Sequence, residues 1–134
     1  TKFANAGQVC VTPDRFFVHE SLHDAFITEF TKRADALTLG DGLDEKSEMG
    51  PLINARRLAE ITAIVEEAAQ DGATLHCGGV RDSGHNSGYF YRPTVLSNVT
   101  DQMRVFSEEN FGPIAAITSF NAYVCFIYKF HLLT

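Results

Sequence analysis

The sequence predicts an α/β domain whose sheet is mostly parallel and flanked by helices. Short segments rich in β-branched and aromatic residues alternate with two long segments in which apolar residues recur at helical spacing. Parallel strands need a long crossover connection, usually a helix, so this alternation indicates parallel pairing. The 134 residues, 45% hydrophobic and 21% charged, suffice for one domain with a buried core.

A strand followed by a helix is expected in the first third of the chain. β-branched and aromatic side chains around Pro13 predict a strand within residues 10–19. Ser21 can cap a helix that ends near Gly40. The apolar side chains of this helix fall at helical spacing: Leu22, Phe26, Ile27, Phe30 and Ala34.

The rest of the domain combines a second helix with shorter β segments. A polar, glycine-containing connection over residues 40–51 leads to Asn54, a candidate N-cap, and to a helix that stops near Gly72. Pro93 indicates the edge or the start of a strand. Three further strands are expected over residues 73–77, 89–99 and 114–120.

The composition restricts the partners and the compartment. The net charge of −6 arises from acidic and basic residues spread along the chain, so no basic stripe is available for nucleic acid. No signal-peptide layout is present, and no apolar run reaches the roughly 18 residues that a membrane span needs. We therefore expect a cytoplasmic protein that binds neither nucleic acid nor membrane.

The cysteines and histidines do not form a metal-binding pattern. The 3 cysteines are odd in number and far apart, and His19 and His23 fall at a strand-to-helix transition. Neither a disulfide framework nor a metal site is expected.

Cys10 is the strongest candidate for chemistry. Gly7 and Gln8 precede it, and a glycine there permits a tight turn that exposes the sulfur and a backbone N–H on one side. An attacking thiolate in such a turn has a built-in donor for the oxyanion that it creates. Because the sequence places no base beside the thiol, spacing alone does not name the reaction.

Two further segments have a functional and a structural interpretation. Residues 108–113, with the sequence EENFGP, form either a polar turn or a rigid turn whose carboxylate accepts hydrogen bonds from a vicinal diol while a ring packs on a flat ligand. The glycines of residues 78–88 do not match G-x-G-x-x-G and precede a strand, so a flexible hairpin-like loop is favoured over a phosphate cradle.

In their order and spacing, these motifs resemble the aldehyde dehydrogenase superfamily. The likeness begins with F-x-N-x-G-Q-x-C over residues 3–10 and ends with E-E-x-F-G-P over residues 108–113. Between them lie Arg15, the turns G-D-G and G-P-L-I, a Gly-Gly pair and the strand P-T-V-L. The chain thus resembles part of the catalytic domain of such an enzyme, covering about 120 residues.

The resemblance implies a reaction and roles for six residues. Cys10 would attack an aldehyde to give a thiohemiacetal, and hydride transfer to NAD or NADP would leave a thioester that water hydrolyses. The backbone N–H of Cys10 would form half of the oxyanion hole. Glu109 would bind the nicotinamide ribose and Phe111 would pack near the nicotinamide, while the substrate tunnel would be lined by Ala4, Val9 and Val11.

The resemblance also implies that this chain is a fragment. In the family, the general-base glutamate, a second oxyanion donor and the dinucleotide-binding domain precede the nucleophile, and the full-length enzyme is expected to be a homo-oligomer. We divide the chain into a partial catalytic domain over residues 1–120 and a divergent apolar tail over residues 121–134. Thr12 is bulkier than the usual residue there, and Ala4 replaces an arginine common in enzymes specific for succinate semialdehyde, so the aldehyde stays open.

Two other hypotheses follow from the same residues. One is a catalytically inactive structural fragment that associates with intact subunits. The other is a cysteine hydrolase that pairs Cys10 with a histidine, and it requires a contact that spacing does not specify.

Overall fold

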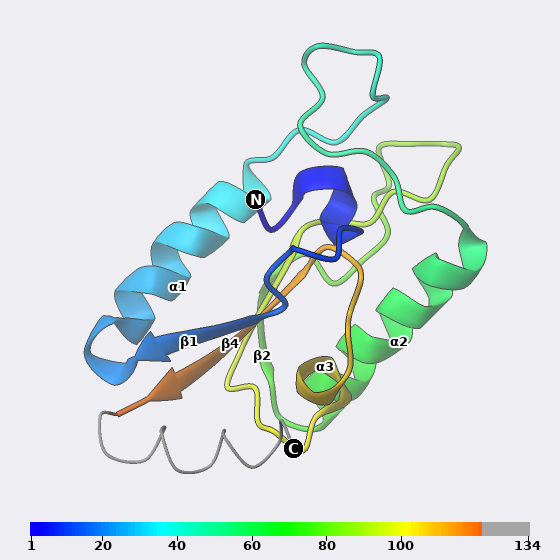
Figure 1. The fold of residues 1–134 in the computed structure, drawn as a ribbon. Coiled ribbons are helices and arrows are strands. Elements are labelled where there is room, and N and C mark those ends of the chain that lie inside the picture. The colour runs from blue at the N-terminus through cyan, green and yellow to red at the C-terminus, as the bar shows by residue number, and fades with distance from the viewer. Residues whose placement is uncertain (122–134) are drawn as a thin grey trace.

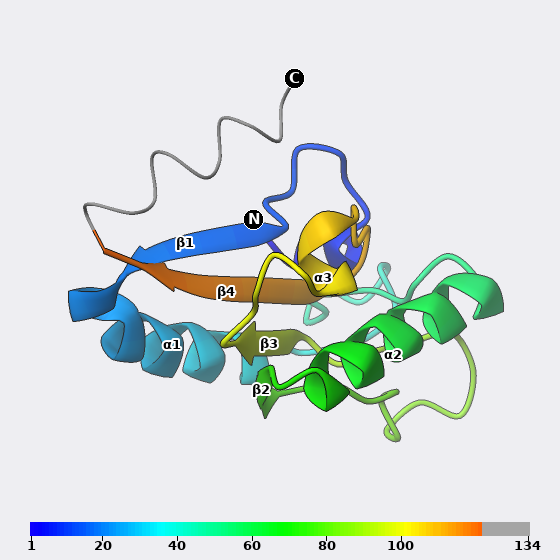
Figure 2. The same ribbon diagram turned by 90° about the horizontal axis from the view of Figure 1, so that it is seen from below.

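A four-stranded sheet forms the centre of the computed structural model, which describes residues 1–121 (Figure 1). The strand order is β1-β4-β3-β2, with β4 next to β1 and β3 (Figure 2). β4 pairs in parallel with β1 and with β3, whereas β2 and β3 are antiparallel. The α/β prediction with a mostly parallel sheet is confirmed. The strands are β1 (Arg15–His19), β2 (Thr74–Cys77), β3 (Thr94–Ser97) and β4 (Ile114–Phe120).

Helices cover both faces of the sheet. α1 (Glu20–Asp35) lies on one side, and α2 (Ala55–Gln70) with the short α3 (Arg104–Ser107) lies on the other (Figure 1). Neighbouring residues of β3 divide accordingly, because Val95 joins the core under α1 and Leu96 joins the core under α2. The fold therefore has three layers with two hydrophobic cores.

The beginning and end of α1 differ from the prediction. The helix begins at Glu20, and the N-cap is His19, whose ring Nδ1 accepts a hydrogen bond from the N–H of Ser21 at 3.2 Å. Ser21 therefore lies inside the first turn and is not the cap. The helix ends at Asp35, before Gly40, because the chain then extends to form a parallel bridge between Leu39 and Met49.

The second helix was predicted closely. The Asn54 side-chain oxygen accepts a hydrogen bond from the N–H of Arg57 at 2.8 Å, so Asn54 is the N-cap. Gly72, with φ of +102°, follows the end of the helix. This cap and stop explain why α2 occupies residues 55–70.

Two β segments are shorter than expected. Residues 10–12 form a turn, residues 13–14 have no regular secondary structure, and β1 is only the second half of the predicted strand. Within residues 89–99, only β3 is a regular strand, preceded by an isolated bridge between Tyr91 and Arg81. Pro93 stands immediately before β3, which confirms its position at a strand start.

The described part of the chain contains no helix with the length and apolar character of a membrane span. Across residues 1–121, no cluster of three or more histidine, cysteine or acidic side chains is arranged to hold a metal ion. All of the predicted tail except Asn121 lies outside the described residues.

Candidate active site

Cys10 lies in an exposed turn between the 3₁₀ helix η1 (Ala4–Gly7) and β1. The N–H of Thr12 donates to the carbonyl of Val9 at 2.9 Å, so the chain reverses direction around Cys10. Neither the thiol nor the backbone N–H of Cys10 has a hydrogen-bond partner within residues 1–121. Both groups are therefore available to a ligand.

The turn owes its shape to a run of left-handed residues. Asn5, Ala6 and Gly7 have φ values of 50°, 54° and 71°. Gly7 is required there because a Cβ atom would lie 2.1 Å from the carbonyl oxygen of Gly112. This close backbone approach places Gly7, three positions before Cys10, against Gly112, three positions after Glu109.

Gln8 anchors the Cys10 turn to a third segment. Its Oε1 accepts a hydrogen bond from the N–H of Ile53 at 2.9 Å, and its Nε2 donates to the carbonyls of Asn5 at 3.1 Å and Pro51 at 3.4 Å. The sequence indicated Gln8 as part of the turn but did not reveal its partner. The sequence feature that could have indicated this contact is that the motifs G-Q-x-C and G-P-L-I occur together.

The segment after α3 carries the two predicted cofactor residues. Glu109 is exposed, and its carboxylate has no hydrogen bond or ion pair within the described residues. Phe111 is half-buried and has φ of 45°, a strained value for a large side chain. Gly112 follows, and a Cβ there would lie 2.3 Å from Cδ1 of Ile61 on α2. The backbone at Gly112 is therefore packed between Ile61 of α2 and Gly7.

Asn110 fixes the same segment from inside the protein. It is fully buried, and its Nδ2 donates to the carbonyl of Val105 at 3.0 Å. Its N–H donates to Oδ2 of Asp14 at 3.1 Å, and its carbonyl accepts from Nη1 of Arg57 at 3.4 Å. Sequence reasoning missed this residue, since it sits between two motif residues without a pattern of its own.

The three predicted substrate residues are not all in one place. Ala4 is exposed and lines a hollow of 540 Å³ with the rings of Phe3, Phe16 and Phe30. Val9 is half-buried and Val11 is 86% exposed, and neither they nor Cys10 lines that hollow. The described residues join the segments on either side of Cys10 to residues 108–112, but they do not join Ala4 to Val9 and Val11 as the wall of one cavity.

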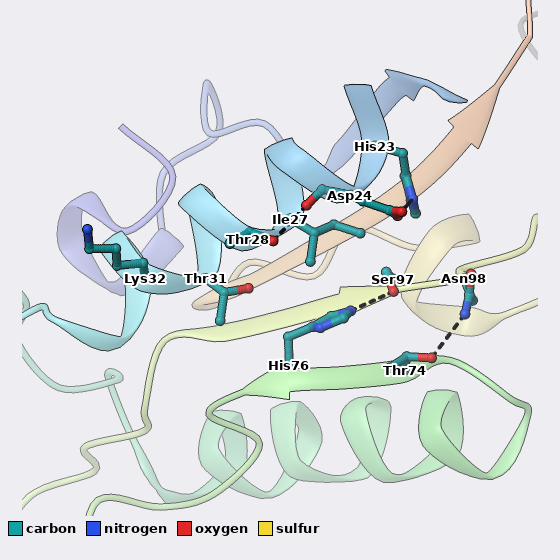
Figure 3. A pocket seen from close by; sticks show the side chains of 10 residues that line it. All are labelled: His23, Asp24, Ile27, Thr28, Thr31, Lys32, Thr74, His76, Ser97 and Asn98. Atoms are coloured by element: carbon teal, nitrogen blue, oxygen red, sulfur yellow. Dashed lines mark hydrogen bonds and ion pairs between the residues drawn. The ribbon is translucent and has the colours of Figure 1, made fainter. Parts of the chain in front are cut away.

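A second hollow of 650 Å³ lies between α1 and the strands β2 and β3 (Figure 3). On its floor, Nε2 of His76 is 2.7 Å from the hydroxyl of Ser97. Partial burial lowers the pKa of His76, and the nearby His23 lowers it further. Within residues 1–121, no histidine makes a hydrogen bond to Cys10, so the contact that a cysteine hydrolase requires is not formed among these residues.

Cys77 differs chemically from Cys10. Burial raises the pKa of the Cys77 thiol to about 11, and the sulfur donates to the carbonyl of Pro93 at 3.6 Å. The following Gly78 approaches the same carbonyl so closely that a Cβ would lie 2.2 Å from it. These residues build the hairpin-like connection between β2 and β3 that was predicted.

Sequence comparison relates the chain to one family. Residues 1–126 match the aldehyde dehydrogenase family model. The chain is 47% identical over 120 residues to the non-phosphorylating aspartate-semialdehyde dehydrogenase of Halomonas elongata, covering 89% of this chain and 24% of that protein. It is 42% identical over 120 residues to cytosolic aldehyde dehydrogenase 1 of Rattus norvegicus, covering 90% and 24%. The chain thus spans about a quarter of the length of these relatives.

Solved structures agree with this relationship. The fold matches 3,6-anhydro-L-galactose dehydrogenase in complex with NAP with a TM-score of 0.86 at 40% identity, over 90% of this chain and 26% of that one. It matches the NAD⁺ complex of an aldehyde dehydrogenase from Bacillus cereus with a TM-score of 0.84 at 33% identity, over 90% and 25%.

Proposed function

Because the chain belongs to the aldehyde dehydrogenase family, we propose that it is the nucleophile-bearing part of an enzyme that oxidises an aldehyde with NAD or NADP. The observation that carries the proposal is the approach of Gly7 to Gly112, which packs the segment leading into the Cys10 turn against the segment that contains Glu109. The structural matches named as NAP and NAD⁺ complexes support the choice of cofactor. We further propose that the full-length enzyme is a homo-oligomer.

In the proposed reaction, Cys10 supplies both a nucleophile and a donor. The thiolate attacks the carbonyl carbon, the carbon–oxygen π pair moves to oxygen, and the unpaired N–H of Cys10 donates to that oxyanion. Hydride loss from the carbon of the thiohemiacetal restores the carbonyl as a thioester. Water then attacks the thioester, and the acid leaves while the sulfur regains its proton.

The residues of the Glu109 segment fit the nicotinamide end of the cofactor. Glu109 has two carboxylate oxygens without partners in the described residues, as a vicinal ribose diol requires, and the half-buried Phe111 supplies an aromatic ring two positions further along the chain. When bound, the cofactor supplies the hydride acceptor. The chain's own contribution is to hold the ribose and the thiol at a constant separation, which the Gly7–Gly112 contact favours.

We also propose that residues 1–120 need further protein to turn over. The relatives are about four times as long as the matched segment. The resemblance implies that the general base and the dinucleotide-binding domain lie in the part that precedes the nucleophile. The isolated chain should therefore reduce no cofactor, although an exposed thiol can still react with electrophiles.

A segment exchange tests the proposal. Residues 1–120 replace the matching segment of the Halomonas elongata relative, and the chimera is assayed for reduced cofactor with an aldehyde and NAD or NADP. We expect turnover that falls at least about 10³-fold in Cys10→Ala and persists in the matched control Cys77→Ala. A folded chimera without turnover, or an unimpaired Cys10→Ala variant, would contradict the proposal.

A second candidate function is a non-catalytic fragment that associates with intact subunits. The observation that favours it is apolar exposure beside the site, where Val11 is 86% and Ile53 is 77% exposed. Co-elution of the chain with an intact relative, lost on Val11→Ser with Ile53→Ser, would support association. Separate elution at micromolar concentrations would exclude it.

A further inference from the structure

The residues on either side of Glu109 in the sequence are each held by a side chain at the start of β1. One side chain belongs to the first residue of the strand, and the other belongs to the residue before it. Oδ2 of Asp14 accepts the N–H of Asn110 at 3.1 Å, on one side of Glu109. Nη2 of Arg15 donates to the carbonyl of Glu108 at 3.4 Å, on the other side. Asp14 and Asn110 are 96 positions apart in the sequence, so these contacts join distant segments.

Each of the two side chains makes a second interaction that restrains it. The other oxygen of Asp14 accepts a hydrogen bond from the ammonium of Lys2 at 3.0 Å, and Lys2 is almost fully buried. The guanidinium of Arg15 also donates from Nε to the carbonyl of Phe106 and lies over the ring of Phe106, with Cζ 5.4 Å from the centroid. Neither side chain can swing away without losing a second interaction.

The same two residues follow Cys10 by four and five positions. In the sequence, Gly7 precedes Cys10, whereas Asp14 and Arg15 follow it. Gly112 follows Phe111, whereas the residues that Asp14 and Arg15 bind precede it. Contacts on both sides of each turn restrict rotation as well as translation, which a single contact does not.

We propose that Asp14 and Arg15 form a clamp that holds the backbone of Glu109 at a fixed position relative to the Cys10 turn. Both are positioning residues, since they touch the peptide groups beside Glu109. The inference rests on the proposed function for its purpose, because a constant separation between thiol and ribose-binding carboxylate matters only for hydride transfer. The clamp itself is a geometric property of the chain.

The test measures that separation directly in the full 134-residue chain. Cys77→Ser and Cys125→Ser remove the other thiols, Glu109→Cys adds a second site, and spin labels at positions 10 and 109 give a distance distribution. We expect Lys2→Met with Asp14→Ala, and separately Arg15→Met, to broaden the distribution about twofold or more. Circular dichroism establishes that each variant is folded.

Matched variants distinguish loss of the clamp from the general effect of removing a charge. Lys2→Met alone keeps the Asp14–Asn110 bond and should leave the distribution narrow, as should Arg33→Met, which breaks only the exposed pair with Glu29. Lys2→Met with Asp14→Asn retains an acceptor oxygen and should restore the narrow distribution. If the Asp14→Ala protein does not fold, Arg15→Met decides the matter.

An unchanged distribution in either folded variant, Lys2→Met with Asp14→Ala or Arg15→Met, would overturn the clamp, as would equal broadening in Lys2→Met with Asp14→Asn. The measurement needs neither cofactor nor turnover. An inactive chimera would therefore count against the proposed function, while the distance distributions would still decide the clamp.

Discussion

The two cysteines within residues 1–121 have opposite environments, so they should react differently. Cys10 is exposed in its turn, whereas burial raises the pKa of Cys77 to about 11. A shift of this size lowers the thiolate fraction of Cys77 about 100-fold relative to an unperturbed thiol. In a Cys125→Ser background at mildly alkaline pH, iodoacetamide should label Cys10 alone, as read by peptide mass spectrometry. Equal labelling of Cys77 would contradict this assignment.

His76 should make the stability of the fold depend on pH. Its folded-state pKa lies below the unfolded value, so the unfolded chain binds the proton more readily. The contribution is complete above about pH 6.5 and is lost as the pH falls below that value towards the folded pKa. Urea titrations at neutral and mildly acidic pH should show that acidification lowers the free energy of unfolding less in His76→Gln than in the unaltered protein. The glutamine amide can still reach Ser97. An identical pH dependence in both proteins would exclude His76 as a contributor.

At the scale of elements, Gly7 determines how the Cys10 turn meets the Glu109 segment. Gly7→Ala places a Cβ on a left-handed residue and within 2.1 Å of the Gly112 carbonyl. We expect a loss of about 3 kcal/mol in the free energy of unfolding, measured with urea. Gly42→Ala is the matched control, because a Cβ there meets nothing within 4 Å. Equal tolerance of both substitutions would show that the close approach is not needed.

Helix α2 supports the same segment from the other side. Ile61 is fully buried, and its Cδ1 atom occupies the space that a Cβ on Gly112 would enter. Ile61→Ala should lower the free energy of unfolding by about 3 kcal/mol, since it leaves a cavity under the Glu109 segment. Ile53→Ala, at a site that is 77% exposed, should change it by less than about 0.5 kcal/mol. Thermal or urea unfolding of the two variants checks the difference.

At the scale of the whole molecule, the position of β4 assembles the site. β4 lies between β1 and β3, so the segment that leads into β4 runs beside the segment that leads into β1. Parallel pairing aligns the starts of the two strands at the same edge of the sheet. The Cys10 turn and residues 108–113 precede these two strands and therefore meet.

The proposed division at residue 120 predicts that a shorter chain retains the fold. Both hydrophobic cores found in the described part of the structure consist of residues before Thr118. A chain that ends at Asn121 should unfold within about 0.5 kcal/mol of the full chain in urea titrations. A lower stability, or loss of the cooperative transition, would show that residues 122–134 belong to the domain.

The sequence alone determined the family, the α/β class and α2, and it predicted Cys10 as the nucleophile. These follow from short-range signals: a glycine and an amide before a thiol, apolar periodicity between Asn54 and Gly72, and motifs kept in order. The same signals misplaced the start of α1, because a histidine ring served as the cap where a serine hydroxyl was expected. Local chemistry permits several caps, and packing selects among them.

Only the tertiary structure decided how the parts of the site are joined. Nothing near Asp14 indicates that its carboxylate holds the N–H of a residue 96 positions away, and nothing near Gly7 indicates that it must lie against Gly112. The physical reason is that both contacts exist only once β4 has paired with β1, and strand order is a property of the packed sheet. The sequence singled out Cys10 as the predicted nucleophile, and packing decided how the segments on either side of it are held.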